Sequence, residues 1–452
     1  MAVRGGVIGY PAMKRTIYLL VGVWLCFVLA LPSRAAELAE LKERRERAAK
    51  AFADGVLLLH SNATPGIVAD GYRERAAFYY LTGLENSPGV MLAIDGKSGE
   101  SWLFVPPLQR YETREVEGGD ATARKLGLDH VVDWAEVENF LAKKISLGEQ
   151  IYYERGQAEL PADLSATEVA RAPAWIQLLA NKWPKASFHP AGTRLYSLMA
   201  VESPSEQQAS RAAARATVAA VLAGMQTIRP GVSQRSVEVA VESACWKAGA
   251  RGVSFWPWAM SGANGVFPKP FESESRYDHL DAVMNSGDLV RLDVGCEWQH
   301  YQGDLGRTVP VSGRYTDEQR EIWNIFVDVY RATAKTFRED ITEDQAFETW
   351  KKELLGHRET TKCALARQAI ESWSDRKNVP FWQMHTMNLD AGFLEGGLRT
   401  GMVIDFEPIA SIGGQGYYLE DMYLIGKEGT EVLTPGVPYT AEEIEAYVSQ
   451  KH

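Results

Sequence analysis

Short apolar runs alternate with longer amphipathic stretches in the first half of the chain. The apolar runs have the length of buried strands, and they are Gly55–His60, Val90–Ile94, Ser101–Val105 and Gln150–Tyr153. The amphipathic stretches have the spacing of helices, and they are Leu38–Phe52, Trp134–Ile145 and Thr167–Asn181. Strands and helices that alternate in this way predict an α/β layer.

A strong helix signal at Ser203 opens the second half of the chain. Ser203 suits the N-cap, Pro204 the first helical position and Glu206 the third, which together predict a capping box. Pro230-Gly231 is expected to end this helix. We therefore divide the chain after its N-terminal segment into a first domain, residues 36–197, and a second domain, residues 198–452.

The second domain is expected to contain both helices and strands. Helical spacing runs from Ser233 to Ala248 and through most of residues 317–375. Apolar runs predict strands at Val253–Met260, Leu289–Val294, Gly306–Val311, Met402–Pro408 and Tyr417–Ile425.

Composition and charge are those of an ordinary globular protein. The 452 residues are 46% hydrophobic and 24% charged, which argues against a disordered chain and against a multi-span membrane protein. The net charge of −11 argues against a nucleic-acid partner, because general nucleic-acid binders are basic.

The N-terminus has the order of a secretory signal. Lys14 and Arg15 precede the apolar run Ile17–Leu31, and small residues follow at Ser33 and Ala35. We expect a signal peptide at residues 1–35, cleaved near Ala35, with translation starting at Met1 or Met13. The alternative is an uncleaved anchor, but the apolar run is shorter than the ~20 residues that span a bilayer. The expected location is the periplasm or the medium, with no stable membrane span after cleavage.

Three cysteines remain after cleavage. They are Cys245, Cys296 and Cys363, which allow at most one disulfide. The sequence does not say which two would pair. Export would place them in a compartment where thiols can oxidise.

Asp293 and Asp304 predict an acidic pair across a hairpin. Their midpoint falls between Trp298 and Gln299. If the chain turns there, the two aspartates lie directly opposite each other, with Cβ atoms about 5 Å apart.

Glu407 and Glu420 predict a second acidic pair of the same kind. Their midpoint falls between Gly413 and Gly414. A Gly-Gly pair between apolar runs is a strong signal for a two-residue hairpin. These two glutamates are therefore also expected to face each other.

Both acidic pairs need compensating positive charge. Like charges that face each other destabilise a strand pair, and carboxylates in apolar strands are costly unless they are paired or bind metal. Divalent cations would remove the repulsion, and one carboxylate can bridge two of them. The alternative is that the strands are exposed, with Arg291 and Arg307 as salt-bridge partners. The occurrence of two such pairs favours metal.

His385 adds a nitrogen donor to this set. It lies in the apolar segment 381–387, where a lone histidine is more often a satisfied core residue. Together with four carboxylates, however, it gives a mixed oxygen–nitrogen set. Such a set suits manganese, cobalt, iron or zinc, and its oxygen majority favours manganese.

The segments around these residues resemble the pita-bread metallopeptidases, in particular aminopeptidase P and prolidase. The metal motifs of the family resemble residues 287–297, 303–311, 401–408 and 419–421, with Gly429 and 433–434. The N-terminal half adds Phe78-Tyr79-Tyr80-Leu81-Thr82-Gly83, which is similar to a signature of the aminopeptidase P N-terminal domain. The likeness covers roughly residues 38–438. It implies an α+β fold in which a smaller α/β N-terminal domain precedes a pita-bread catalytic domain.

The resemblance implies a dinuclear metal site that activates water for peptide hydrolysis. Its ligands would be Asp293, Asp304, His385, Glu407 and Glu420. Asp304 and Glu420 would bridge the two ions, and Glu407 would also be the general base. The implied function is an exported, metal-dependent aminopeptidase of the Xaa-Pro aminopeptidase or prolidase type. Relatives often pair through the N-terminal domain, so a homodimer is also open.

Three positions depart from the family pattern. Lys269 and Gly392 stand where the family has histidines, and Tyr418 stands where it often has arginine. In the family these groups bind substrate and stabilise the transition state. We therefore count Lys269 and Tyr418 as candidate catalytic residues. His279, in a loop ten residues beyond Lys269, is a third candidate.

These departures leave two alternatives to an aminopeptidase. The first is a non-peptidase enzyme on the same metal scaffold, of the creatinase or lyase type, acting on a small amino-acid-derived substrate. The second is a binding homologue with weak catalysis, against which the retained ligand set argues. Function lies in the site and not in the fold, so the sequence does not fix the substrate.

Overall fold

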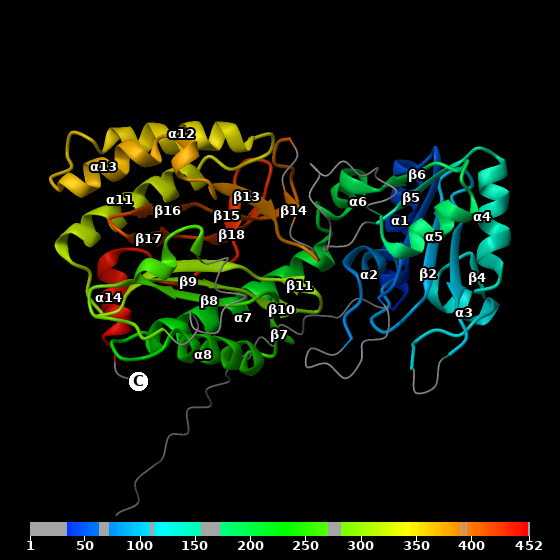
Figure 1. Cartoon of the computed structure of the whole chain (residues 1–452), viewed down its shortest axis with the longest axis horizontal. Helices are drawn as coiled ribbons and strands as arrows, with labels where there is room; N and C mark the ends of the chain where they lie inside the picture. The colour runs from blue at the N-terminus through cyan, green and yellow to red at the C-terminus, as the bar shows by residue number, and fades with distance from the viewer. Residues whose placement is uncertain are drawn as a thin grey trace, which may run out of the picture.

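The computed structural model describes residues 34–62, 72–108, 113–154, 172–269, 282–389, 392–393 and 396–450. These residues form two bodies that lie side by side (Figure 1). The smaller body runs from α1 (Arg34–Ala51) to α6 (Gly192–Met199), and the larger one runs from α7 (Pro204–Thr227) to α14 (Ala441–Val448). The domain boundary predicted after residue 197 lies within α6 and stays a prediction. The predicted signal segment lies outside the described residues except for its last two positions.

The smaller body is a six-stranded sheet with helices on both faces. The strand order is β4-β3-β2-β1-β5-β6, with β1 (Gly55–His60), β2 (Met91–Asp95), β3 (Ser101–Val105), β4 (His130–Asp133), β5 (Gln150–Tyr153) and β6 (Phe188–Pro190). The four predicted strands are thereby confirmed. β4 has only two apolar residues, Val131 and Val132, and β6 is only three residues long, so the sequence did not reveal them.

Alternating side chains of β1 serve two separate cores. Leu57 and Leu59 pack on one face, with α1, α6, α2 (Ala76–Thr82) and α3 (Asp120–Leu126). Val56 and Leu58 pack on the other face, with α4 (Glu136–Ser146) and α5 (Ala174–Lys182). Because successive side chains of a strand point to opposite faces, a fully apolar strand requires cover on both sides. The predicted α/β layer is confirmed.

The larger body contains four sheets between two groups of helices. In Figure 1, α11, α12 and α13 lie above the sheets, α7 and α8 lie below them, and α14 lies at their left end. These helices are α8 (Gln234–Lys247), α11 (Asp317–Ala334), α12 (Glu343–Gly356) and α13 (Ala364–Trp373). The predictions of a helix from Ser233 and of a mostly helical segment 317–375 are confirmed.

The sheets of the larger body carry the segments with the predicted motifs. The first two sheets are β12-β9-β8 and β11-β10-β7, formed by β7 (Gly252–Val253), β8 (Trp258–Ser261), β9 (Leu289–Val294), β10 (Cys296–Trp298), β11 (Tyr301–Gln302) and β12 (Leu305–Pro310). The others are β14-β13-β15-β18-β19 and β16-β17, formed by β13 (Gln383–Thr386), β14 (Gly392–Phe393), β15 (Val403–Glu407), β16 (Ile409–Ile412), β17 (Gln415–Tyr418), β18 (Asp421–Ile425) and β19 (Thr430–Val432).

Two predicted strands are in fact broken. The run Val253–Met260 divides into β7 and β8 around Pro257, which has no N–H to donate to a ladder. The run Tyr417–Ile425 divides into β17 and β18, so that Glu420 lies between two strands. The second break shapes the candidate site.

The capping box at Ser203 is confirmed and also joins the two bodies. The Ser203 hydroxyl accepts from the Glu206 N–H at 3.3 Å, and the Ser203 N–H donates to Glu206 Oε2 at 2.8 Å. From the smaller body, Arg44 lies 3.3 Å from Glu206 Oε2, and Glu40 accepts a hydrogen bond from the Ser203 hydroxyl at 2.5 Å. The start of α7 is therefore held by residues of α1.

A disulfide ties α8 to the strands of the first acidic hairpin. Cys245 and Cys296 are bonded, with Cα atoms 5.5 Å apart, and Cys363 is free. This agrees with the prediction of at most one bridge, and it identifies the pair that the sequence left open.

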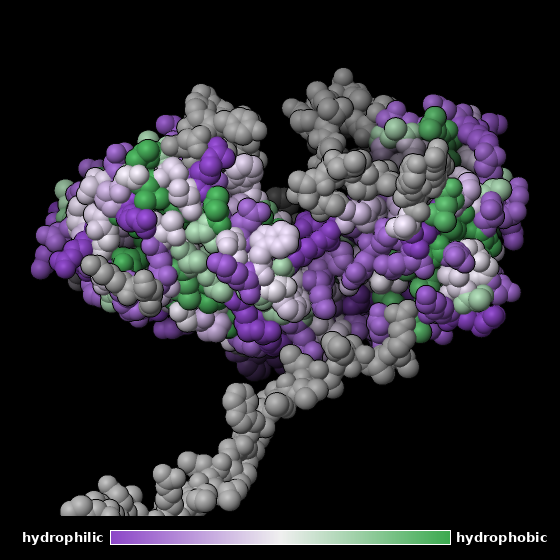
Figure 2. Space-filling model, turned by 90° about the horizontal axis from the view of Figure 1, so that it is seen from below, coloured by the Kyte–Doolittle hydropathy of each residue, from purple (hydrophilic) through white to green (hydrophobic). Residues whose placement is uncertain are grey.

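The surface of the described residues is mixed. In the view of Figure 2, hydrophilic residues cover much of the region where the two bodies meet, and hydrophobic residues form separate patches on each body. No helix in the described part of the chain is long and apolar enough to cross a membrane.

Candidate metal centre

The first acidic hairpin has a different register from the predicted one. Its turn is Gln299-His300, and both residues have positive φ (50° and 71°), as a two-residue type I′ loop requires. Asp293 therefore lies opposite Gly306, so the prediction that it lies directly opposite Asp304 is wrong. The offset is two residues along the strand. Because residues two apart share a face, both aspartates still point to the same side.

The second acidic hairpin has the predicted register. Gly413 and Gly414 form its turn with φ of 59° and 74°. Strand β16 pairs with β17, and β15 pairs with β18, in registers that are both symmetric about the Gly413–Gly414 turn. Glu407 and Glu420 are also equally far from this turn along the chain. The ladder opens at Glu420, whose N–H donates to the Gly306 carbonyl at 3.1 Å. This bridge connects the two acidic hairpins.

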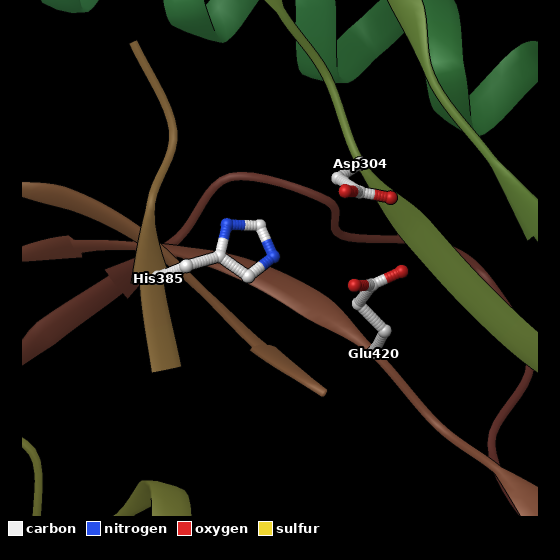
Figure 3. A group of neighbouring side chains, drawn as sticks. All are labelled: Asp304, His385 and Glu420. Atoms are coloured by element: carbon white, nitrogen blue, oxygen red, sulfur yellow. The ribbon is translucent and has the colours of Figure 1, made fainter. Parts of the chain in front are cut away.

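The structure brings all five predicted donor side chains to one place. Asp304, His385 and Glu420 each present one donor atom, and these atoms lie within 4.8 Å of one another (Figure 3). Asp293 and Glu407 line the same pocket as Asp304 and His385. The exposed fractions of the five residues range from 0% to 8%, so the alternative of exposed acidic strands is wrong.

Two buried arginines lie beside the acidic strands. Arg291 Nη2 donates to Asp293 Oδ2 at 2.8 Å, and its guanidinium lies 4.4 Å from the Tyr418 ring. Arg307 Nη2 instead donates to Asp421 Oδ1 at 3.1 Å, outside the predicted donor set. The salt-bridge alternative is therefore right for Arg291, which offsets the charge of one of the four carboxylates.

Several buried oxygen and nitrogen atoms of the site, which could bind a metal, have no hydrogen-bond partner among the described residues. They are Asp304 Oδ1, Glu420 Oε1, His385 Nδ1 and both carboxylate oxygens of Asp405. Buried polar atoms are almost always satisfied in proteins. Carboxylates and imidazole together are the donors that divalent transition metals prefer, so these residues fit a group of bound divalent cations.

The pocket beside the carboxylates has an aromatic wall. Phe255, Trp258 and Phe381 line it, together with Gln383 and Gly392. The side-chain amide of Gln383 donates to Glu407 Oε1, which fixes the orientation of that carboxylate. A small apolar group next to the donor atoms would contact the aromatic rings.

Comparisons with known proteins agree with the motifs. The family model for metallopeptidase family M24 matches residues 208–427, and the model for the aminopeptidase P N-terminal domain matches residues 41–152. The chain therefore contains a metallopeptidase family M24 domain, preceded by an aminopeptidase P N-terminal domain. The two matched regions follow each other along the chain in the same order as the smaller and the larger body.

Relatives of the whole chain are peptidases. The Xaa-Pro aminopeptidase of Escherichia coli is 26% identical over 404 residues, which cover 83% of this chain and 88% of that protein. The intermediate cleaving peptidase 55 of Arabidopsis thaliana mitochondria is 23% identical, covering 90% of this chain and 82% of that protein. The structure of E. coli aminopeptidase P with the inhibitor Pro-Leu has a TM-score of 0.72 at 24% identity, covering 92% of this chain and 98% of that one. This last similarity confirms the predicted α+β fold, a pita-bread domain preceded by a smaller α/β domain.

The other predicted catalytic residues have different outcomes. Tyr418 lies within the site. Lys269 is exposed and is not among the described residues that line the pocket, so its catalytic role stays a prediction. His279 lies outside the described residues.

Tyr418 is fully buried among the carboxylates. Its hydroxyl donates to Glu420 Oε2 at 2.5 Å and lies 3.4 Å from Glu407 Oε2. The ring lies directly on the backbone of Gly306, where an added Cβ would be 1.9 Å from Tyr418 Cε1. Tyr418 is therefore placed to orient the two glutamates.

Replacing Tyr418 should weaken metal binding more than it affects the fold. Groups that hydrogen-bond to metal ligands typically contribute 10–100-fold to metal affinity, so Tyr418→Phe is expected to weaken manganese binding by roughly 10-fold or more. Calorimetric titration of the metal-free protein measures the effect. Tyr417→Phe is the matched control, because Tyr417 is buried next in the chain but packs on Trp373 of α13. Equal manganese affinity in Tyr418→Phe and the wild type would contradict this role.

Burial and mutual repulsion raise the pKa values of Asp293, Asp304 and Glu420. Burial raises the pKa of Asp293 to about 6, although the nearby Arg291 guanidinium lowers it. Burial, followed by the charge of neighbouring carboxylates, raises the pKa values of Asp304 and Glu420 well above the usual range. Such carboxyls favour a bound proton or a cation in its place.

The stability of the metal-free protein should fall as pH rises through this range. A carboxyl whose pKa is raised by folding binds more protons in the native state than in the unfolded chain. Its contribution to the free energy of unfolding is therefore present below pH 4 and is lost as pH rises to about 6. For Asp293 alone the loss is on the order of 1–3 kcal/mol. Urea unfolding in a chelator at pH 4.5 and pH 6.5 measures it. Asp293→Asn should show a smaller change between the two pH values, and an equal change would contradict the prediction.

Two residues of the site were not singled out from the sequence. Gln383 precedes His385 by two residues and shares its face, as Asp405 does with Glu407. The signal that could have found both is the two-residue period of a strand, because each lies two positions before a predicted donor.

Proposed function

We propose that this chain is an exported aminopeptidase of the Xaa-Pro type that uses two divalent cations, with manganese as the preferred metal. The observation that supports it most is the convergence of Asp304, His385 and Glu420, whose donor atoms lie within 4.8 Å of one another. The unpartnered buried oxygens of this cluster are better explained by bound cations than by a structural role.

The five predicted donors would share the two cations in the manner that the family resemblance implies. Asp304 of the first acidic hairpin and Glu420 of the second have donor atoms within 4.8 Å of each other and would bridge the ions. Asp293 would serve one ion, and His385 and Glu407 the other. When bound, the cations would lower the pKa of a water molecule and polarise the substrate carbonyl.

The residues of this chain would orient and exchange protons around that water. Glu407 lines the pocket. The Gln383 amide contacts its Oε1 and the Tyr418 hydroxyl lies 3.4 Å from its Oε2, so the orientation of the carboxylate is fixed. A carboxylate so positioned can accept the proton of the attacking water and return it to the leaving amine. Glu407 is therefore the general base in this proposal.

The aromatic wall supports a peptide with an apolar residue near the cleaved bond. Phe255, Trp258 and Phe381 provide an apolar surface next to the donor carboxylates. The ring of proline is compact and apolar, so it suits such a surface. This favours a peptide over the amino-acid derivatives of the creatinase and lyase alternatives.

The disulfide supports export. A bond between Cys245 and Cys296 is stable where thiols oxidise and rare in a reducing cytosol. Together with the predicted signal peptide, it favours the periplasm or the medium. Detection of the bridge by mass spectrometry in protein recovered from the exported fraction, with residues up to about Ala35 removed, tests this part.

A substrate panel tests the activity. Metal-free protein is supplied with manganese and incubated with Xaa-Pro dipeptides, Xaa-Pro tripeptides and creatine, and products are identified by mass spectrometry. Release of the N-terminal residue in wild type, and its loss in Glu407→Gln, is the expected result. Turnover of creatine without peptide cleavage would favour the non-peptidase alternative, and no turnover of any substrate would favour the binding homologue.

A further inference from the structure

Asp405 is a fifth buried carboxylate in the metal centre. It lies on β15, two residues before Glu407, and its exposed fraction is 0%. Neither of its carboxylate oxygens has a hydrogen-bond partner among the described residues. A buried carboxylate without a donor or a cation is strongly unfavourable.

The strand register directs Asp405 toward the proposed metals. Asp405 is paired with His385 across β15 and β13, and directly paired residues of an antiparallel ladder point to the same face. The His385 ring points toward Asp304 and Glu420 (Figure 3). The Asp405 side chain is therefore on the side of the sheet that faces the donor cluster.

The charged groups that act most strongly on Asp405 are negative. The carboxylate of Glu420 is its strongest electrostatic neighbour, and Glu407 also contributes. In turn, Asp405 is the strongest electrostatic neighbour of Asp304.

The hydrogen-bond donors of the described site residues serve other carboxylates. The Tyr418 hydroxyl donates to Glu420, the Gln383 amide donates to Glu407, and Arg291 donates to Asp293. Asp405 is thus placed beside two carboxylates without a neutralising group from the described protein residues. A cation bound beside Asp405 would offset this negative charge.

We propose that Asp405 is an additional ligand of the metal centre, on the side formed by Asp304 and Glu420. The inference rests on the proposed function only for the presence of divalent cations, not for the reaction. It makes the donor set five carboxylates and one imidazole. A larger share of oxygen donors favours manganese over zinc, so Asp405 would also contribute to the choice of metal.

Asp405→Asn distinguishes a ligand from a buried neutral acid. Asparagine has the shape of a protonated aspartate, so it should leave metal binding unchanged if Asp405 only fills space. If Asp405 is a ligand, the variant should bind manganese at least about 10-fold more weakly, the scale seen even for groups that only support metal ligands. Calorimetric titration of metal-free wild type and variant measures the affinity and the number of ions.

Asp421→Asn is the matched control. Asp421 is equally buried on the neighbouring strand, but it pairs with Arg307, Thr434 and Tyr439. The Asp421→Asn variant should therefore bind manganese with an affinity within about 3-fold of wild type. This change is well under the 10–100-fold loss of metal affinity that is typical when a group supporting a metal ligand is removed. If Asp405→Asn does not fold, Asp405→Thr provides the same test, because a small β-branched residue suits a strand.

Thermal unfolding provides a second readout that does not need activity. In a chelator, Asp405→Asn should unfold at a higher temperature than wild type, because one buried negative charge is removed. With manganese, the rise in melting temperature should be smaller in the variant than in wild type. Unchanged manganese affinity in Asp405→Asn, or a wild type that binds no manganese, would overturn the proposal. A wild type that binds two ions but cleaves no peptide would refute the proposed function and leave this inference intact.

Discussion

Asp304→Ala is expected to lose both divalent cations and to lower kcat/KM by at least about 10³-fold, equivalent to about 4 kcal/mol of transition-state stabilisation. Asp304 belongs to the first acidic hairpin, and its donor atom is within 4.8 Å of those of His385 and of Glu420 in the second hairpin. In the bridging position its loss removes a bond from each ion. Elemental analysis of the purified variant, together with peptide turnover at saturating manganese, measures both effects.

Asp328→Ala is the control for this change, because Asp328 lies exposed on α11. It should retain the metal content and the activity of wild type. A variant of Asp304 that still holds two ions per chain would contradict the bridging role, even if its activity were low.

Cleavage of Xaa-Pro peptides by the wild type is expected to be slow, with kcat/KM below the ordinary enzyme range of ~10⁴–10⁸ M⁻¹s⁻¹. Lys269 and Gly392 stand at positions where the family has histidines, and Tyr418 stands where it often has arginine. Loss of one transition-state donor typically costs ~10²–10³ in rate. Tyr418 hydrogen-bonds to Glu420 and is fully buried, so it does not supply a donor to the pocket. Because the carboxylates remain, we expect slow hydrolysis and not its complete loss.

Lys269→Ala tests whether another residue has taken over a lost donor. If Lys269 stabilises the transition state, the variant should lower kcat with little change in KM. Steady-state kinetics on Xaa-Pro tripeptides, with manganese supplied, measures both constants. A wild-type kcat/KM within the ordinary range would show that other residues rebuild the missing contacts, and the prediction of slow cleavage would then be wrong.

The two acidic hairpins show how far a turn can be predicted from sequence. Gly413 and Gly414 mark their turn, because glycine adopts positive φ at no cost. Gln299 and His300 adopt the same conformation without being glycine, and no local signal identified them. The predicted turn was therefore displaced by one residue, which shifts the pairing by two. The shared face of the two aspartates survived, because that shift is even.

The site could be predicted where it depends on strand periodicity, and not where it depends on packing between segments. The four acidic residues and His385 were found from their spacing and from the family motifs. The bridge from Glu420 to Gly306 could not be found, because it joins strands that are far apart in sequence. The contact of Tyr418 with Gly306 has the same origin. Asp405 was overlooked although it lies two residues before Glu407, where the strand period places it on the same face.

The most direct test of the dinuclear centre is the anomalous difference map of a crystal grown with manganese. The expected result is two peaks per chain, each about 2.0–2.6 Å from oxygen or nitrogen donors. Asp293, Asp304, His385, Glu407 and Glu420 should contact them, with Asp304 and Glu420 between the two peaks. A map without peaks at these side chains, in crystals saturated with manganese, would contradict the proposed metal centre.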